Sequence, residues 1–231
     1  MGYLIFRGVS TESLTDVYVS KMPSHKKAAM RTAEYYVKGR DGVLHVDEGY
    51  ENYDITVTLL LLNATVDKRY IVNAWADGTG KLVTSDDLTR AYSASVKDEI
   101  QWTRVSANGG FYDMAEITFN CQPFMYEAVD SIIELTETAS FINPGSAESF
   151  PLIKVEGSGD ATFSVNGGDI SIASMTAEVP VYIDCANGYV YTESGATTMT
   201  GDIPYLTMGT NTITLVSGVT KITVTPHWRW V

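Results

Sequence analysis

The sequence predicts a mainly β protein in two domains, and three observations support this. Short stretches of alternating apolar and polar residues recur along the chain, separated by turn-forming residues. Thr is abundant and charged residues make up only 19%, which is typical of sheets with polar faces. Residues 1–130 hold 13 Lys+Arg and 18 Asp+Glu, whereas residues 131–231 hold 3 and 10. This shift in charge indicates one domain over residues 1–130 and a second over residues 131–231.

In the N-terminal half, the pattern predicts two strands, Asp54–Leu62 and Met114–Phe124, with Pro123 ending the second. Between them we expect one α-helix, with Thr65 as its N-cap and Asp77–Gly80 as its stop. Apolar residues at helical spacing predict the buried face of this helix: Val66, Tyr70, Ile71, Ala74 and Trp75.

In the C-terminal half, turn residues predict an antiparallel β-sandwich of about 90 residues. We expect three hairpins: Ala161–Asn166 with Asp169–Ala173 across Gly167-Gly168, Val179–Asp184 with Tyr189–Tyr191 across Ala186-Asn187-Gly188, and Asn211–Val216 with Lys221–Trp230 around Ser217-Gly218. Gly157-Ser158-Gly159 is expected to form a turn between the strands Ile153–Glu156 and Ala161–Val165. Trp228 and Trp230 alternate in phase with Ile222 and Val224, so we expect them in the core, with stacking on sugar rings as the alternative.

The net charge of −12 disfavours a basic nucleic-acid binder. No apolar run approaches the roughly 20 residues that cross a bilayer, so no membrane insertion is expected. The start, Met1–Phe6, lacks the basic region of a signal peptide, so we expect synthesis in a cytoplasm, followed either by retention there or by release through lysis.

No pattern of catalytic or metal-binding residues stands out. His25, His45 and His227 lie in separate regions, and the sequence has no G-x-S-x-G motif. Cys121 and Cys185 have no spacing motif and are expected to be buried thiols. We therefore expect no enzyme activity, no metal and no cofactor.

Two sets of residues are candidates for binding. The only basic cluster is expected to be a mobile arm or subunit-contact segment, or else an ordinary solvated loop: Lys21, His25, Lys26, Lys27 and Arg31. Four tyrosines are candidates for an exposed binding face, with a plain strand surface as the alternative: Tyr182, Tyr189, Tyr191 and Tyr205.

The order of elements resembles a known family. Phe150–Gly159, Val181–Asp184, Ile203-Pro204-Tyr205-Leu206 and Pro226–Trp230 follow one another as in the C-terminal domain of the distal tail (Dit) proteins of bacteriophages with long, non-contractile tails. The strand that ends in Cys121-Gln122-Pro123-Phe124 is similar to the close of the first domain in that family.

This resemblance implies a structural protein of the virion tail tip, made in the cytoplasm of the bacterial host. It implies an N-terminal β-sandwich with its helix that forms a hexameric ring, and a galectin-like, jelly-roll C-terminal sandwich. The implied partners are further copies of the chain, the tail tube protein, the tail-tip hub protein and receptor-binding proteins, with DNA only in transit. The alternative is a carbohydrate-binding module that recognises host cell-wall polysaccharide.

Overall fold

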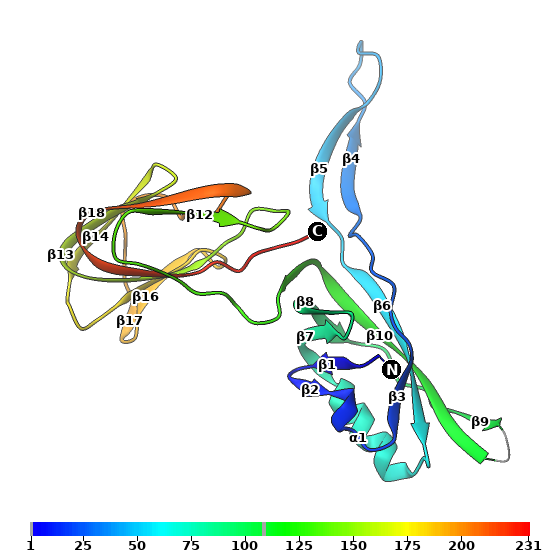
Figure 1. Cartoon of the computed structure of the whole chain (residues 1–231). Coiled ribbons are helices and arrows are strands. Elements are labelled where there is room, and N and C mark those ends of the chain that lie inside the picture. Colours follow the sequence, from blue (N-terminus) through cyan, green and yellow to red (C-terminus); the bar gives the residue numbers. More distant parts are fainter. Residues whose placement is uncertain (1, 108–109) are drawn as a thin grey trace. The chain divides into compact units, whose positions relative to one another are not determined.

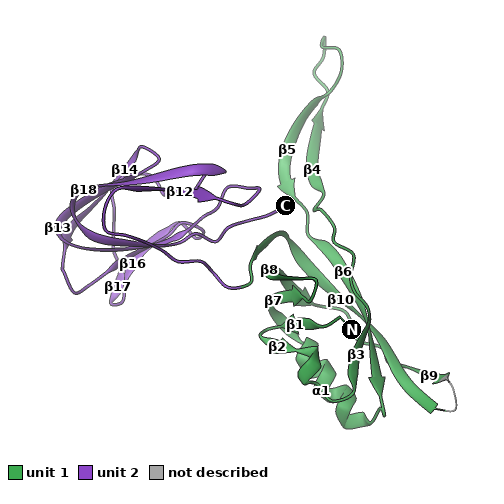
Figure 2. Cartoon of the chain, viewed as in Figure 1, with its two compact units in different colours: residues 1–128, 231 green, residues 129–230 purple. Residues whose placement is uncertain are grey.

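A computed structural model describes residues 2–107 and 110–231. The chain divides into two compact units, residues 1–128 with Val231 and residues 129–230 (Figure 2). The described residues are mostly in strands, with one α-helix, which confirms the predicted mainly β class (Figure 1). Within these ranges no helix combines the length and apolar character that a membrane span needs.

The first unit combines strands with the α-helix and one 3-10 turn. Its elements are β1 (Leu4–Phe6), β2 (Val9–Ser10), η1 (Thr11–Ser13), β3 (Val17–Lys21), β4 (Met30–Tyr35), β5 (Leu44–Tyr50), β6 (Tyr53–Leu62), α1 (Val66–Ala76), β7 (Gly78–Thr84), β8 (Asp87–Val96), β9 (Thr103–Ala107) and β10 (Gly110–Glu127). The main sheet is antiparallel, in the order β2-β1-β7-β8-β10-β6-β3, with β9 paired to β10. Strands β4 and β5 form a separate two-stranded sheet.

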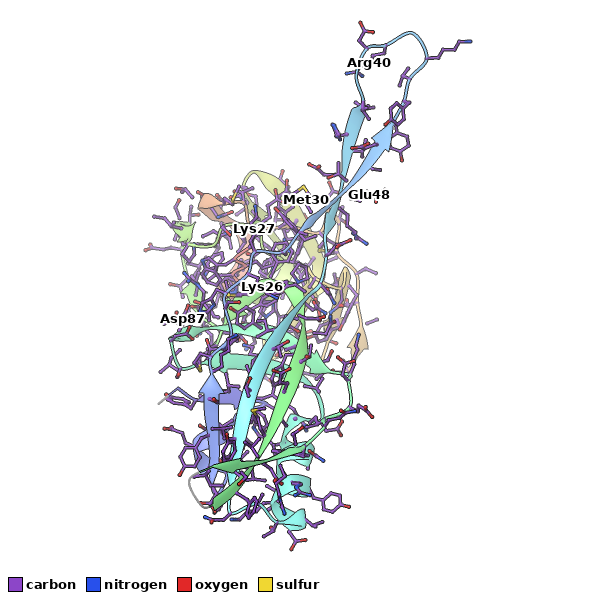
Figure 3. All side chains as sticks on the ribbon, turned by 90° about the vertical axis from the view of Figure 1, so that its right-hand side faces the viewer. Lys26, Lys27, Met30, Arg40, Glu48 and Asp87 are labelled. Atoms are coloured by element: carbon purple, nitrogen blue, oxygen red, sulfur yellow. The ribbon has the colours of Figure 1, made fainter. Side chains whose placement is uncertain are left out.

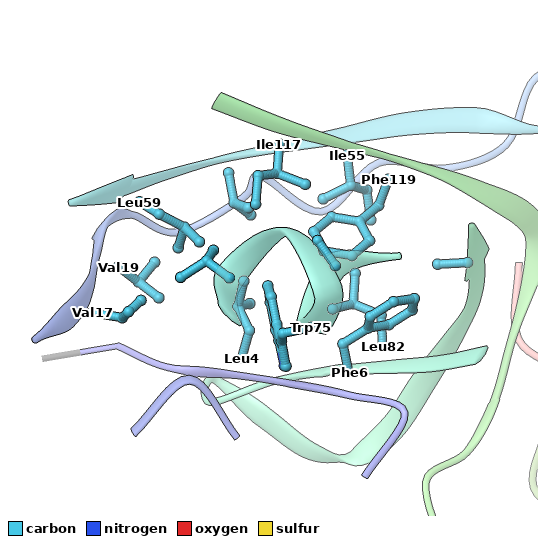
Figure 4. Packing of buried hydrophobic residues seen from close by; sticks show 14 of the residues in the cluster. Leu4, Phe6, Val17, Val19, Ile55, Leu59, Trp75, Leu82, Ile117 and Phe119 are labelled. Atoms are coloured by element: carbon cyan, nitrogen blue, oxygen red, sulfur yellow. The ribbon is translucent and has the colours of Figure 1, made fainter. Parts of the chain in front are cut away.

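The core of the first unit lies between two parts of the curled main sheet. Figure 4 shows side chains from β6 and β10 facing side chains from β1 and β7, with the indole of Trp75 between them. Phe6 makes edge contacts with Trp75 at 6.0 Å and with Phe119 at 5.2 Å, measured between ring centroids. The alternation predicted for Asp54–Leu62 is confirmed, because Ile55, Val57, Leu59 and Leu61 are all buried.

The helix forms where it was predicted, but of its predicted buried face only Trp75 is buried, and Ala74 is exposed. Thr65 caps it by accepting a hydrogen bond from the Lys68 amide. Val66, Tyr70 and Ile71 are more than half exposed, and the buried residues are Val72, Trp75 and Ala76. The indole N–H of Trp75 donates to the Val9 carbonyl at 2.9 Å, and this bond between distant segments helps to fix the rotation of the helix.

A buried carboxylate ties the helix to the sheet. Asp113, on β10, has a side chain that is only 1% exposed. It accepts hydrogen bonds from Arg69 Nε of α1 at 2.6 Å and from Arg104 Nε of β9 at 3.0 Å. Although desolvation would raise the pKa of Asp113, the two guanidinium groups hold it below its ordinary value.

Strand β10 does not end at Pro123, as the sequence had indicated. It continues to Glu127, and its pairing with β8 shifts between Cys121 and Met125. Proline has no amide hydrogen to donate, so it is tolerated inside a strand at such an irregularity.

The second unit consists of eight strands in one hydrogen-bonded network. They are β11 (Ile133–Leu135), β12 (Ala139–Asn143), β13 (Leu152–Val165), β14 (Gly168–Met175), β15 (Val181–Asp184), β16 (Tyr189–Thr192), β17 (Gly195–Ala196) and β18 (Gly209–Thr225). The first part of β18 pairs with β12 and with the end of β13, which also pairs with β14. The second part of β18 pairs with β11 and with the start of β13. The start of β13 also pairs with β15, β15 pairs with β16, and β16 pairs with β17.

Two long strands replace the turns that were expected at Gly157–Gly159 and at Ser217-Gly218. Strands β13 and β18 run through these glycines, and their pairing shifts there. Gly218 has φ +67°, and a side chain on it would lie 2.5 Å from the Asp160 carbonyl oxygen. A side chain on Gly157 would collide with the Gly218 carbonyl. The glycines therefore allow the two strands to cross closely and to bend, and the chain does not reverse its direction at them.

The other two predicted hairpins form, with one shift of a turn. The turn between β13 and β14 is Asn166-Gly167, both at positive φ, rather than Gly167-Gly168. Trp228 is buried and Trp230 is partly buried against the same core, as expected. The galectin-like character of this unit stays a prediction.

Candidate assembly site

His25 lies at the root of the β4–β5 hairpin and is bonded to its own unit. Its Nδ1 lies 2.6 Å from the Tyr92 hydroxyl, and its Nε2 lies 2.6 Å from Asp86 Oδ2. Desolvation would raise the pKa of Asp86, but hydrogen bonds from Thr84 and His25 hold it below its ordinary value. Burial raises the pKa of Tyr92 to about 12, so its hydroxyl stays neutral. This network fixes where the hairpin leaves the body of the unit.

The other residues of the basic cluster follow the same segment. Lys26 donates to the Asp54 carbonyl at 3.0 Å, and Arg31 on β4 donates to the Glu48 carbonyl at 3.1 Å. Lys21 ends β3 and is exposed, as is Lys27. The five residues predicted as a contact arm therefore run along the root of the hairpin and onto its first strand, and Figure 3 shows Lys26 and Lys27 below Met30.

The hairpin itself projects from the unit, and we call residues 30–50 the arm (Figures 1 and 3). Among the residues that the structure describes, its strands pair only with each other, and all but two of the 13 residues of these strands are exposed. Its exposed large apolar side chains include Tyr35 (53%), Tyr36 (80%), Val37 (49%) and Val46 (43%). An isolated two-stranded hairpin is marginally stable in water, so a surface that covers this one would stabilise it.

The five residues predicted as a contact segment lie at the root of the arm and on its first strand, and most of the arm lies beyond them. Two signals mark the hairpin: the alternation of Leu44 and Val46 with His45 and Asp47, and the turn glycines between the strands. Gly39 and Gly42 both adopt positive φ at its tip. The alternation does not show whether the apolar side chains meet a core or remain exposed.

The outer face of β6 and β10 is polar over the paired segments 54–58 and 116–120, and beyond them it carries the apolar side chains of Leu60, Leu62 and Met114. The opposite face of both strands builds the core. Thr56 and Thr118 pair across the strands, with their hydroxyl oxygens 3.3 Å apart. Asn120 donates to Asp54 at 2.9 Å, and Glu116 lies exposed on the same face. In this part of the face the two strands present hydroxyls, amides and carboxylates, and the Lys26 ammonium lies beside them at the Asp54 carbonyl.

In the second unit, three of the four candidate tyrosines come together. Tyr182 of β15 and Tyr191 of β16 are cross-strand partners whose rings stack at 5.1 Å with an interplanar angle of 14°. Tyr189 adds a tilted contact with Tyr191 at 5.4 Å. Because stacking uses the ring faces, this ladder offers less free aromatic face to a ligand than three separate rings would.

Tyr205 lies apart from this ladder. It lines a cavity of about 500 Å³ between the β13–β14 turn and the segment that precedes β18. The structure therefore divides the four tyrosines into a packed ladder and one exposed ring at a cavity.

Potential metal ligands do not gather. Among residues 2–107 and 110–231, no group of three or more His, Cys, Asp or Glu side chains is placed to hold a metal ion. His45 only approaches Glu34 across the arm, at 3.7 Å. Both cysteines are buried free thiols, as the sequence predicted.

Comparison with known proteins finds the same fold in a phage protein. No protein-family model matches the sequence, and no curated protein gives a significant match. The crystal structure of the Dit protein of phage SPP1, described as a paradigm of the hub adsorption apparatus in phages that infect Gram-positive bacteria, matches with a TM-score of 0.71. That match has 14% identity and covers 97% of this chain and 98% of the SPP1 chain.

Two further structures also match. These are the phage P2 baseplate in its activated conformation with Ca and the corresponding p2 baseplate with Sr, each 10% identical and covering 96% of this chain. They cover 96% and 98% of their matched chains, with TM-scores of 0.48 and 0.45, and we base no inference on them. The SPP1 match confirms, at the level of the fold, the resemblance to distal tail proteins that the sequence predicted.

Proposed function

We propose that this chain is a structural protein of a phage tail tip, of the distal tail type. The observation that carries the proposal is the fold, which matches that of the SPP1 Dit protein over nearly the whole length of both chains. A match that spans both units supports a shared architecture rather than one common module. Its place would be the virion tail tip, after synthesis in the bacterial host, with no catalytic role.

The assembled form is proposed to be a hexameric ring. A ring requires a head-to-tail interface that closes. The arm supports this, because it exposes apolar side chains that a neighbouring copy would cover, and its root is tied to the body through His25. The main sheet also ends at β2 and β3, each paired on one side only within the described chain.

In this role the ring would join the tail tube protein to the tip hub and the receptor-binding proteins, and DNA would pass through it. We propose that the polar part of the outer face of β6 and β10, residues 54–58 and 116–120, lines the passage. Its charged side chains Asp54 and Glu116 would repel the DNA phosphates, and its hydroxyls would keep the wall hydrated. Replacing both acids by lysine should produce salt-sensitive DNA binding that the unaltered protein lacks.

Native mass spectrometry tests the ring directly. The unaltered protein, alone or with its neighbouring tail proteins, should form hexamers, and a triple variant in the arm (Tyr36→Ser, Val37→Ser, Val46→Ser) should not. A matched control removes exposed apolar side chains of the second unit, Ile142→Ser and Val216→Ser, which are 70% and 62% exposed, and should keep the ring. Strict monomers under every condition would refute the ring, whereas rings that survive the arm variant would refute only the role of the arm.

The alternative function, recognition of cell-wall polysaccharide, belongs to the second unit. The stacked ladder of Tyr182 and Tyr191 gives it little support, because the two ring faces are packed against each other. Among the candidate tyrosines, Tyr205 is the one whose surroundings favour polysaccharide binding.

A further inference from the structure

The cavity beside Tyr205 has the size of a ligand site. Its volume of about 500 Å³ falls within the range of about 300–1,000 Å³ that small-molecule sites occupy. One wall is the turn from Val165 to Asp169, and the other is the segment from Gly201 to Thr207. Both walls belong to the second unit, so the cavity is complete within it.

One buried side chain holds both walls in place. Asn211 is fully buried, and its Oδ1 accepts hydrogen bonds from Asn166 Nδ2 and from the Thr207 amide, each at 2.8 Å. Its Nδ2 donates to the carbonyls of Thr207 at 2.9 Å and Gly209 at 3.0 Å. The cavity is therefore preformed, and a ligand would bind without first having to order these loops.

A close backbone approach fixes the far end of the cavity. Gly201 has φ +112°, and any side chain on it would collide with the Asp169 carbonyl. Next to it, Thr200 and Ser171 exchange two backbone hydrogen bonds, at 2.8 and 2.9 Å. The segment before β18 is thus attached to β14 as well as to Asn211.

The lining combines an aromatic ring with hydrogen-bond acceptors. Tyr205 is 47% exposed, and Ile203 and Pro204 add apolar surface beside it. Asp169 and Asp202 are exposed, and neither forms an ion pair or a side-chain hydrogen bond with any residue that the structure describes. These carboxylates can accept hydrogen bonds from a ligand.

The charge of the cavity restricts the ligand. Its lining contains two carboxylates and no Lys or Arg, so a phosphate, sulfate or carboxylate group would meet repulsion without a counter-ion. A neutral pyranose fits better, because its C–H face packs on an aromatic ring and its hydroxyls donate to carboxylates. A single arginine or lysine side chain would satisfy the charge but would fill only part of a cavity of this size.

We propose that this cavity binds one or two rings of an uncharged saccharide, with Tyr205 as the stacking surface and Asp169 and Asp202 as acceptors for hydroxyl groups. The proposal goes beyond the proposed tail function and does not depend on ring formation. It assigns sugar contact to the cavity rather than to the ladder formed by Tyr182, Tyr189 and Tyr191.

Saturation-transfer NMR on the full chain, with glucose, galactose and N-acetylglucosamine and their disaccharides as probes, tests the proposal. At least one probe should bind, Tyr205→Ala should weaken binding by about tenfold or more, and Tyr205→Phe should retain most of it. Asp202→Asn should also weaken binding, since an amide is a poorer acceptor than a carboxylate. The matched control Tyr189→Ala removes a half-exposed tyrosine of the ladder and should leave binding unchanged.

Three outcomes would overturn the proposal. They are the absence of binding by every saccharide probe, saccharide binding that Tyr205→Ala leaves intact, and binding of arginine methyl ester in place of the sugars. The last would assign the cavity to a basic side chain of a partner protein. Circular dichroism of each variant checks that the exposed substitutions leave the fold unchanged.

Discussion

Replacing Asp113 by asparagine should lower the free energy of unfolding of the first unit by about 2–3 kcal/mol at neutral pH. The carboxylate is 1% exposed and accepts hydrogen bonds from Arg69 and Arg104. Asparagine keeps the size but loses the charge, and its NH₂ group would face a guanidinium donor. Breaking a fully buried ion pair costs about 3–5 kcal/mol. The loss expected here is smaller, because the side chains of Arg69 and Arg104 are 31% and 55% exposed and water can still solvate them.

The effect should also depend on pH. The folded-state pKa of Asp113 is lowered, whereas the unfolded value is about 3.9, so the carboxylate stabilises the fold above the unfolded pKa. That contribution is lost as the pH falls through the folded pKa. The difference between the unaltered protein and Asp113→Asn should therefore be largest near neutral pH and shrink below about pH 4.

Urea titration read by hydrogen–deuterium exchange measures this change in the intact chain. Peptides from each unit are followed separately, because two compact units need not unfold together. Glu116→Gln is the matched control: it removes one carboxylate from the same strand at an exposed position and should change stability by less than about 0.5 kcal/mol. The reasoning fails if Asp113→Asn matches this control at pH 7, or if its effect is the same at pH 7 and pH 3.

Three further substitutions or treatments test other features. Gly218→Ala should cost more than about 2 kcal/mol, whereas Gly188→Ala, also at positive φ but in open space, should cost about 1 kcal/mol; equal losses in thermal melts would contradict the steric argument. Ser149→Ala should leave the melting temperature unchanged or raise it, because the buried hydroxyl has no hydrogen-bond partner among the described residues, and a clear drop would contradict this. Burial raises the pKa of both thiols, Cys121 and Cys185, to about 12, so iodoacetamide at pH 8 should label neither in the folded protein and both in urea; labelling without urea would show that they are accessible.

Local patterns predicted much of the fold because they depend on neighbouring residues. Alternation located the strand Tyr53–Leu62, and the N-cap at Thr65 marked the start of the helix within one residue. Asn187-Gly188 marked the hairpin between β15 and β16. In each case backbone hydrogen bonding and side-chain direction are set within a few residues.

The same patterns failed where a distant segment decides. In the sequence Gly157 and Gly218 look like turn residues, yet they lie where β13 and β18 cross closely. The sequence does not distinguish a glycine that allows close approach of two strands from one that allows a turn. The helix presents two apolar faces in sequence, and contacts such as the bond from Trp75 to Val9 decide which one is buried.

The sequence by itself determined the mainly β class and the position of the predicted helix, because these follow from short-range periodicity. The resemblance to distal tail proteins rests instead on the order of short motifs along the chain. The sequence also offered candidate binding residues, without showing which of them meet. Only the tertiary structure decided that residues 30–50 project as an arm, that three tyrosines pack into a ladder, and that Tyr205 lies instead at a cavity built around Asn211. Exposure and proximity arise from contacts between residues far apart in the chain, and a linear pattern does not encode those distances.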